Sequence, residues 1–264
     1  MPLTIYQVDA FADNVFAGNP AAVMPLQAWL DDALLQAIAM ENNLSETAYI
    51  VPVEGGYDLR WFTPQVEVDL CGHATLAAAH ALFEHMGFDG DEVLFHTRSG
   101  ELRVRRAGAR MTMDFPVTDL VSVDVDLDVC NALGGIASEA LAPSSGSGAH
   151  LYVYEFEEDI ATLEPDFAAL LAAGVRSVIV SAPGNDCDIV SRFFAPGLGI
   201  NEDPVTGSAH CSLVPYWAAR LHKQQLQCRQ ISARGGKLDC ELKEGRVFIT
   251  GSAVTYMQGA VDCI

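Results

Sequence analysis

Polar residues gather in two short segments, each directly before an apolar run that is rich in small residues. The first is "DLCGHAT", residues 69–75, and the second is "EDPVTGSAH", residues 202–210. A helix that starts at such a segment has unpaired backbone N–H groups and partial positive charge at its tip. Glycine lets a ligand approach that backbone closely. Two such helix starts facing one place would form an anion site that suits a carboxylate.

The same segments contain side chains that can move a proton. Cys71 stands at the first helix start, where a thiol is expected to have a lowered pKa; a small buried apolar residue is the simpler interpretation. His73 is either reactive or a hydrogen-bonded helix-start residue. His80 and His210 lie inside apolar runs and are expected to pack. Asp203 precedes a proline, a pattern typical of an N-cap followed by an N1 proline.

A further carboxylate stands at the entry to an apolar strand. This is Glu46, in "NLSETAYIVP". An exposed carboxylate at a strand end is the simpler interpretation. A partly desolvated one would have a raised pKa and could both take up and return a proton near neutral pH.

The elements that must position these residues occur twice along the chain. "RWFTP" from Arg60 corresponds to "RFFAP" from Arg192, an offset of 192 − 60 = 132 residues, which is half the chain. The same offset places Cys71 opposite Asp203. In both halves an apolar helix and a strand precede this motif, and a helix of small residues follows it. Blocks in the same order at nearly one offset indicate an internal duplication.

In the first half, the apolar face of the first predicted helix consists of Leu30, Leu34, Ala37 and Ile38. Asn42 and Asn43 end that helix, and strands follow at "ETAYIVPV" and "YDLRWFTP". The small-residue helix "HATLAAAHALFEHMG" ends at Gly87. Many strands and few long helices predict an α+β protein in which each half wraps a sheet around a helix.

Composition limits the partners. The chain has 264 residues, 50% hydrophobic, and a formal net charge of −20, which disfavours nucleic acid and anionic membranes. No segment has the apolar length of a membrane span, and "MPLTIYQVDAF" lacks the pattern of a signal peptide. The seven cysteines form no C-x-x-C pair, which predicts reduced thiols in a cytoplasmic protein. Histidine spacing gives no metal motif, so no metal is expected.

Five segments together resemble the PhzF-like family, which is named for the phenazine-biosynthesis isomerase. They are "DAFADNVFAGNPAAV", "NLSETAYIV", "RWFTPQVEVDLCGHATLAAAH", "MDFP" and "EDPVTGSAH", and the match runs to about residue 215. The resemblance implies the diaminopimelate-epimerase-like fold. That fold has two pseudo-symmetric domains, here 1–116 and 117–264, each a curved, mostly antiparallel sheet or barrel around a central helix. The terminal segment "TYMQGAVDCI" is expected to return to the first domain, and a homodimer is implied.

The resemblance also implies the site, in a cleft between the domains. In the phenazine enzyme a glutamate moves a proton between carbons of a small carboxylate, without cofactor or metal. The match places this general acid/base at Glu46, with His73 and Asp203 as orienting or proton-relaying groups. The substrate carboxylate is expected on Ser208 and the backbone around Gly72 and Gly207, and Asn19 is expected to line the cleft.

Two other functions compete with this isomerase. Related amino-acid epimerases use two cysteines, one from each half, but the repeat mate of Cys71 is Asp203. The missing thiol argues against a racemase or epimerase, which would have to use Cys71 with another base. The third possibility is a non-catalytic member of the family that binds a carboxylate metabolite or a protein. The physiological substrate and any phenazine pathway are not defined by these motifs.

Overall fold

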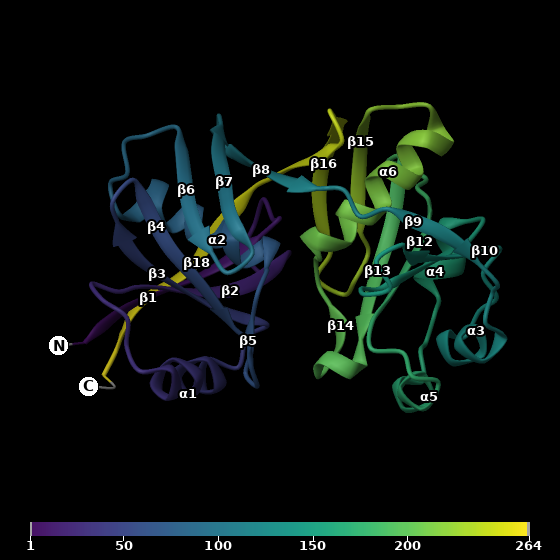
Figure 1. Cartoon of the computed structure of the whole chain (residues 1–264), viewed down its shortest axis with the longest axis horizontal. Helices are drawn as coiled ribbons and strands as arrows, with labels where there is room; N and C mark the ends of the chain where they lie inside the picture. Colours follow the sequence, from purple (N-terminus) through teal and green to yellow (C-terminus); the bar gives the residue numbers. More distant parts are fainter. Residues whose placement is uncertain (1, 263–264) are drawn as a thin grey trace. The chain divides into compact units, whose positions relative to one another are not determined.

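The computed structural model describes residues 2–262, which form two compact units (Figure 1). Unit 1 comprises the described residues up to Asp114 and from Thr250 onward, and unit 2 comprises Phe115–Ile249. Within the described residues, no helix has the length and apolar character needed to cross a membrane. Six cysteines are described and all six are free thiols; Cys263, from the predicted set, lies outside the described residues.

Unit 1 is a curved mixed sheet with two helices. Its helices are α1 (Asp32–Asn42) and α2 (Gly72–His85). Its strands are β1 (Leu3–Ala10), β2 (Asn19–Pro25), β3 (Glu46–Val53), β4 (Gly56–Phe62), β5 (Glu67–Val68), β6 (Glu92–Thr97), β7 (Gly100–Ala107), β8 (Arg110–Pro116) and β18 (Ala253–Val261). The hydrogen-bonded order is β18-β1-β2-β3-β4-β6-β7-β8, with the short β5 also on β4. Only β2–β3 and β4–β6 are parallel, and their connections contain α1 and α2.

Unit 2 repeats this plan with shorter helices. Its helices are α3 (Leu127–Leu133), α4 (Glu157–Ala161), α5 (Phe167–Ala172) and α6 (His210–Leu221), with 3₁₀ turns η1 (Pro196–Leu198) and η2 (Gly207–Ala209). Its strands are β9 (Leu120–Val123), β10 (Glu139–Pro143), β11 (His150–Val153), β12 (Val178–Pro183), β13 (Ile189–Ala195), β14 (Ile200–Asp203), β15 (Gln225–Gln230), β16 (Gly236–Lys243) and β17 (Arg246–Gly251). The order is β9-β10-β11-β12-β13-β15-β16, with β14 on β13, and only β11–β12 and β13–β15 are parallel.

The two units share one order of pairings. From β1 to β7 the pairs are antiparallel, parallel, antiparallel, parallel and antiparallel, in the same succession as from β10 to β16. Each unit also contains an arginine that holds a glutamate with two hydrogen bonds: Arg60 with Glu67, and Arg192 with Glu202. This is the pattern that an internal repeat predicts. The barrel alternative is wrong, because no described pairing joins the two end strands of a unit, β18 with β8 or β9 with β16.

The central helix of unit 1 explains its run of small residues. Helix α2 packs against β1, β2 and β3, and most of its residues are buried, with the alanines from Ala74 to Ala81 at 0% exposure. A helix surrounded by sheet needs small side chains so that the backbones can approach closely. The predicted end of this helix at Gly87 is confirmed, because Gly87 has φ +67° and the Phe88 N–H group donates a hydrogen bond back to the Leu82 carbonyl.

The predicted apolar face of α1 is correct except at Ala37, since Leu30 and Leu34 pack half-buried against the same core cluster as the buried Ile38. The helix begins at Asp32, so Leu30 precedes it, and Ala37 is exposed. The buried residues are Leu35, Ile38 and Ala39, which pack on the outer face of the sheet. Both adjacent leucines belong to the packed face, with Leu35 buried and Leu34 half-buried against the same cluster. The predicted end is correct, since Asn43 is the left-handed C-cap.

Candidate active site

Four predicted site residues of unit 1 lie together around His73. We call Asn19, Glu46, Cys71 and His73 the Glu46 cluster. The His73 Nε2 atom lies 3.1 Å from Glu46 Oε2. On the other side of the ring, His73 Nδ1 lies 3.4 Å from Cys71 Sγ and 3.2 Å from Asn19 Nδ2. The imidazole therefore connects the carboxylate to the thiol and the amide.

The local fold brings these residues together from three elements. Glu46 is the first residue of β3 and pairs with Ala21 of β2, the strand that Asn19 begins. Cys71 is the N-cap of α2, with His73 in its first turn. The turn before Asn19 requires Gly18, which has φ +66° and on which a Cβ would lie 2.2 Å from the Ala10 carbonyl oxygen. Strand pairing and a helix start thus fix the cluster before any ligand binds.

Burial decides the protonation chemistry of the cluster. The His73 side chain is 5% exposed and that of Glu46 13%. Burial alone would lower the pKa of His73, but the Cys71 sulfur and the Glu46 carboxylate hold it well above its usual value. Burial, reinforced by the Glu46 charge, raises the pKa of Cys71 to about 11, against the opposing effect of His73. The expected lowering of this thiol pKa at a helix start is therefore wrong.

The atoms of the Glu46 cluster could serve either of two tasks, relaying a proton or holding a metal ion. Asn19 can present its N–H₂ group or, after rotation of the amide, its oxygen to His73 Nδ1, so it can serve both protonation states of the ring. Ligand atoms of Glu46, Cys71 and His73 lie within 4.8 Å of one another, which is the one grouping of the described residues whose spacing could hold a metal ion. A proton relay is the other task that this arrangement permits.

Gly72 is the buried first residue of α2 in unit 1, and the remaining predicted residues lie together in unit 2. We call residues 203–210 the 203–210 turn. Asp203 is the last residue of β14 and not an N-cap, so that interpretation is wrong; its Oδ2 accepts a 2.5 Å hydrogen bond from the Thr206 hydroxyl. Thr206 is instead the N-cap of η2. Gly207 is buried and Ser208 is exposed at the first turn, ahead of α6.

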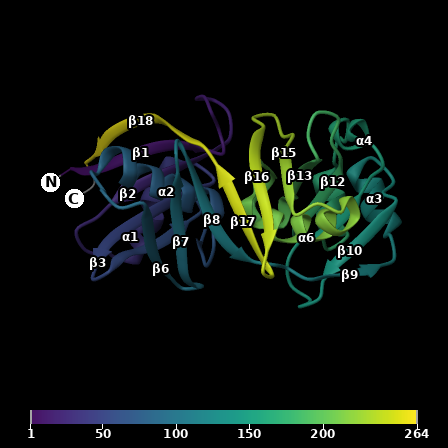
Figure 2. The same ribbon diagram turned by 90° about the horizontal axis from the view of Figure 1, so that it is seen from above.

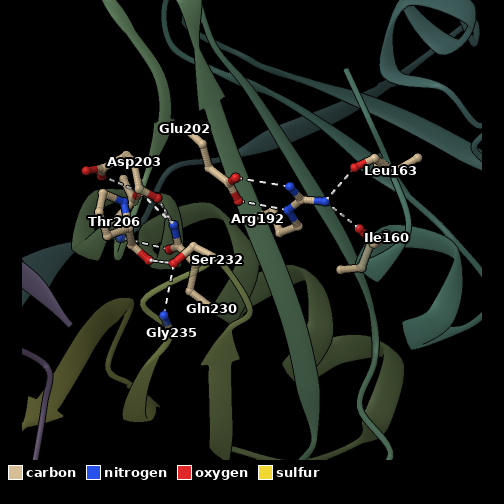
Figure 3. A network of polar contacts seen from close by, with 10 residues as sticks. Ile160, Leu163, Arg192, Glu202, Asp203, Thr206, Gln230, Ser232 and Gly235 are labelled. Carbon is tan, nitrogen blue, oxygen red and sulfur yellow. Dashed lines mark hydrogen bonds and ion pairs between the residues drawn. The ribbon is translucent and has the colours of Figure 1, made fainter. Parts of the chain in front are cut away.

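A buried glutamine that the sequence analysis missed holds this turn in place (Figure 3). The Gln230 amide accepts from Thr206 N–H at 2.8 Å and donates to the Asp203 carbonyl at 2.7 Å. Ser232 adds a hydrogen bond to the Pro204 carbonyl. Gln230 was detectable as the polar residue at an inward position of β15, whose burial alternates with each residue.

We expect Gln230→Leu to lower the free energy of unfolding by about 3 kcal/mol, because it removes both hydrogen bonds that the Gln230 amide makes to buried backbone groups of the 203–210 turn. Equilibrium urea unfolding measures this change. Gln227→Leu is the matched control, since Gln227 is exposed on the same strand. Equal losses in the two variants would contradict the assigned contact.

The chain is similar to known proteins along nearly its whole length. The family model described as phenazine biosynthesis-like protein matches residues 8–259. A Pseudomonas aeruginosa protein named as an uncharacterized isomerase is 53% identical over 261 residues, 99% of each chain. A PhzF-family crystal structure from Enterococcus faecalis is 45% identical, with a TM-score of 0.95 and all of both chains covered.

The fold extends beyond close relatives. A hydroxyproline epimerase from Agrobacterium vitis has a TM-score of 0.66 at 13% identity, over 98% of this chain and 92% of its own. This likeness concerns the fold alone, and it confirms the predicted epimerase-like fold. Together with the match of the family model over nearly the whole sequence, these findings show that the chain belongs to the phenazine biosynthesis-like, or PhzF, family of isomerases.

Proposed function

We propose that this chain is a cofactor-independent isomerase that moves a proton within a small carboxylate substrate, with Glu46 as the general acid/base. The observation that carries the proposal is the buried Glu46–His73 pair, with Oε2 and Nε2 3.1 Å apart, in a member of a family whose relatives include proteins named isomerases. A largely buried carboxylate beside an imidazole is a suitable proton carrier.

In the proposed reaction, Glu46 takes a proton from an activated C–H group of the substrate. The electron pair left on carbon is delocalised through the substrate, and Glu46 then delivers the proton to a different carbon. Every atom is retained, so the product is an isomer. His73 keeps the Glu46 carboxylate oriented through its Nε2 side, and Asn19 fixes the ring from its Nδ1 side.

The 203–210 turn is the proposed carboxylate-binding part of the same site. The exposed Ser208 hydroxyl and the backbone N–H groups around Gly72, Gly207 and Ser208 would hold the substrate carboxylate. Asp203 would orient a polar group of the substrate. This requires both units to act on one substrate, in the cleft that the family resemblance implies. The chain is further proposed to be a cytoplasmic homodimer.

The proposal is tested by a screen of cyclic and amino-bearing carboxylates for deuterium uptake from D₂O. Mass spectrometry would detect the deuterium, and the protein would be treated with EDTA before the assay. We expect at least one compound to take up deuterium and to rearrange, with the rate unchanged by EDTA. A ligand that raises the melting temperature without any exchange would favour the non-catalytic alternative instead. A rate abolished by EDTA would contradict the cofactor-free mechanism.

One observation favours a second candidate, a racemase or epimerase that uses Cys71. The Cys71 sulfur lies 3.4 Å from His73 Nδ1, so the imidazole could accept the thiol proton. The Cys71 pKa of about 11 opposes this, because few thiolates form at neutral pH.

We therefore expect Cys71→Ala to keep substrate deuterium exchange within about tenfold of the wild-type rate, a change smaller than the loss of a general base causes. The measurement is the same D₂O assay. In the epimerase mechanism this substitution would abolish turnover, whereas Glu46→Gln would spare it.

A further inference from the structure

Strand β18 forms an unusual edge of the unit 1 sheet. In the described pairings it is hydrogen-bonded to β1, on the outer side of the unit (Figure 2). Its sequence, AVTYMQGAV, has nine residues without a charge or a proline. Natural proteins usually protect a free edge with lysine, proline or a very short strand. The edge of β18 has none of these devices, although a bulge between Met257 and Thr255 interrupts its register with β1.

The side chains of β18 are exposed as well as its edge. Residues 256–260 are all exposed, including Tyr256 at 48% and Met257 at 43%. The ring of Phe16, itself 70% exposed, lies edge-on to Tyr256 with 5.6 Å between centroids. Phe16 has φ +71°, and its N–H is held by the buried Asp9 carboxylate at 2.8 Å. The loop thus holds an aromatic side chain in solvent beside β18 in an unfavourable backbone conformation.

The net charge of the chain and the absence of charge on β18 indicate which partner can pair with this edge. Two copies of a chain with net charge −20 repel each other over most of their surfaces. An uncharged nine-residue strand is a place where this repulsion is weak. An antiparallel strand pair about a twofold axis is self-complementary, because each strand offers the other the same N–H and C=O groups. Gly259 and Ala260 are small enough to let the two backbones approach.

We propose that β18 pairs with β18 of a second copy, which joins the unit 1 sheets of two chains into one continuous sheet. Tyr256, Met257 and Phe16 then cover apolar surface of the partner copy at this seam. The inference rests on the homodimer of the proposed function and names its surface.

The test is sedimentation velocity of the full chain at about 0.15 M salt, where long-range charge is screened. We expect the wild type to be a dimer, and the double variant Gln258→Glu/Ala260→Glu to weaken dimerisation by at least about tenfold, because like charges meet across the twofold axis. The matched control is Leu171→Glu/Leu198→Glu, which adds the same charge at exposed positions of unit 2. Circular dichroism confirms that both variants fold.

A wild-type monomer, or a dimer that both double variants weaken equally, would overturn the proposal. Hydrogen exchange supplies an independent readout, since the amides of residues 253–261 should lose protection when the wild type is diluted to monomer. A dimer whose β18 amides exchange equally at all concentrations would also overturn it. These measurements record mass and protection, so their failure leaves the role of Glu46 standing.

Discussion

Glu46→Gln is expected to slow deuterium exchange into the substrate by about 10²–10⁴-fold, the usual contribution of a general base. Glutamine has the shape of glutamate, and its oxygen can take the place of the Glu46 oxygen that lies 3.1 Å from His73 Nε2. It has no lone pair basic enough to take a proton from carbon. The rate is measured by proton NMR as the loss of the substrate C–H signal in D₂O.

The matched control for this experiment is Glu54→Gln, which removes one negative charge at an exposed position just after β3. This variant should exchange at the wild-type rate, which separates the loss of a base from the change in net charge. Full-rate exchange in Glu46→Gln would reject Glu46 as the base. An equal loss in both variants would indicate a general electrostatic effect.

The fold was predictable where a local pattern has one stable solution. Alanines and glycine after "DLC" fit only a closely packed helix, and α2 indeed starts at Gly72 and is buried. The repeated Arg-x-Phe-x-Pro motif predicted equivalent strands, and both arginines hold a glutamate on the neighbouring strand. The most deeply buried residues of α1 were not predictable, because Leu34 and Leu35 are both apolar and only packing on the sheet buries Leu35 more deeply than Leu34.

The site was predictable as a set of residues and less so as chemistry. Motifs identified Glu46 and His73, but the pKa of Cys71 depends on burial, which outweighs the lowering by His73 and by the backbone of Ala74. Asp203 beside a proline looks like a cap, yet it ends a strand, since the Thr206 hydroxyl and Gln230 hold the following turn. Gln230 lies 27 residues from Asp203 in the chain, so no local pattern connects them.

Acid should destabilise the protein through His210, at the start of α6. Its Nδ1 lies 2.9 Å from the Thr206 carbonyl oxygen and must carry the proton of that hydrogen bond. The other nitrogen, Nε2, is buried without a hydrogen-bond partner in the described part of the chain. A proton added there would place a charge and an unpaired N–H in the interior. Burial therefore lowers the pKa of His210 to about 4, against the weaker opposite effect of the carbonyl.

The direction of the pH effect follows from this lowered pKa. The unfolded chain binds the proton near pH 6.5 and the folded chain only near pH 4, so stability is present above pH 6.5 and is lost as the pH falls toward 4. The loss of stability amounts to about 3 kcal/mol.

His210→Asn keeps a donor for the Thr206 carbonyl but cannot titrate. The variant is expected to have a lower free energy of unfolding than the wild type at pH 7. This difference in free energy, the stability gap, should narrow by about 3 kcal/mol at pH 4. Urea unfolding at both pH values measures the gap. His150→Asn, at an exposed position, should leave the pH dependence unchanged, and a His210→Asn gap that is constant with pH would refute the assignment.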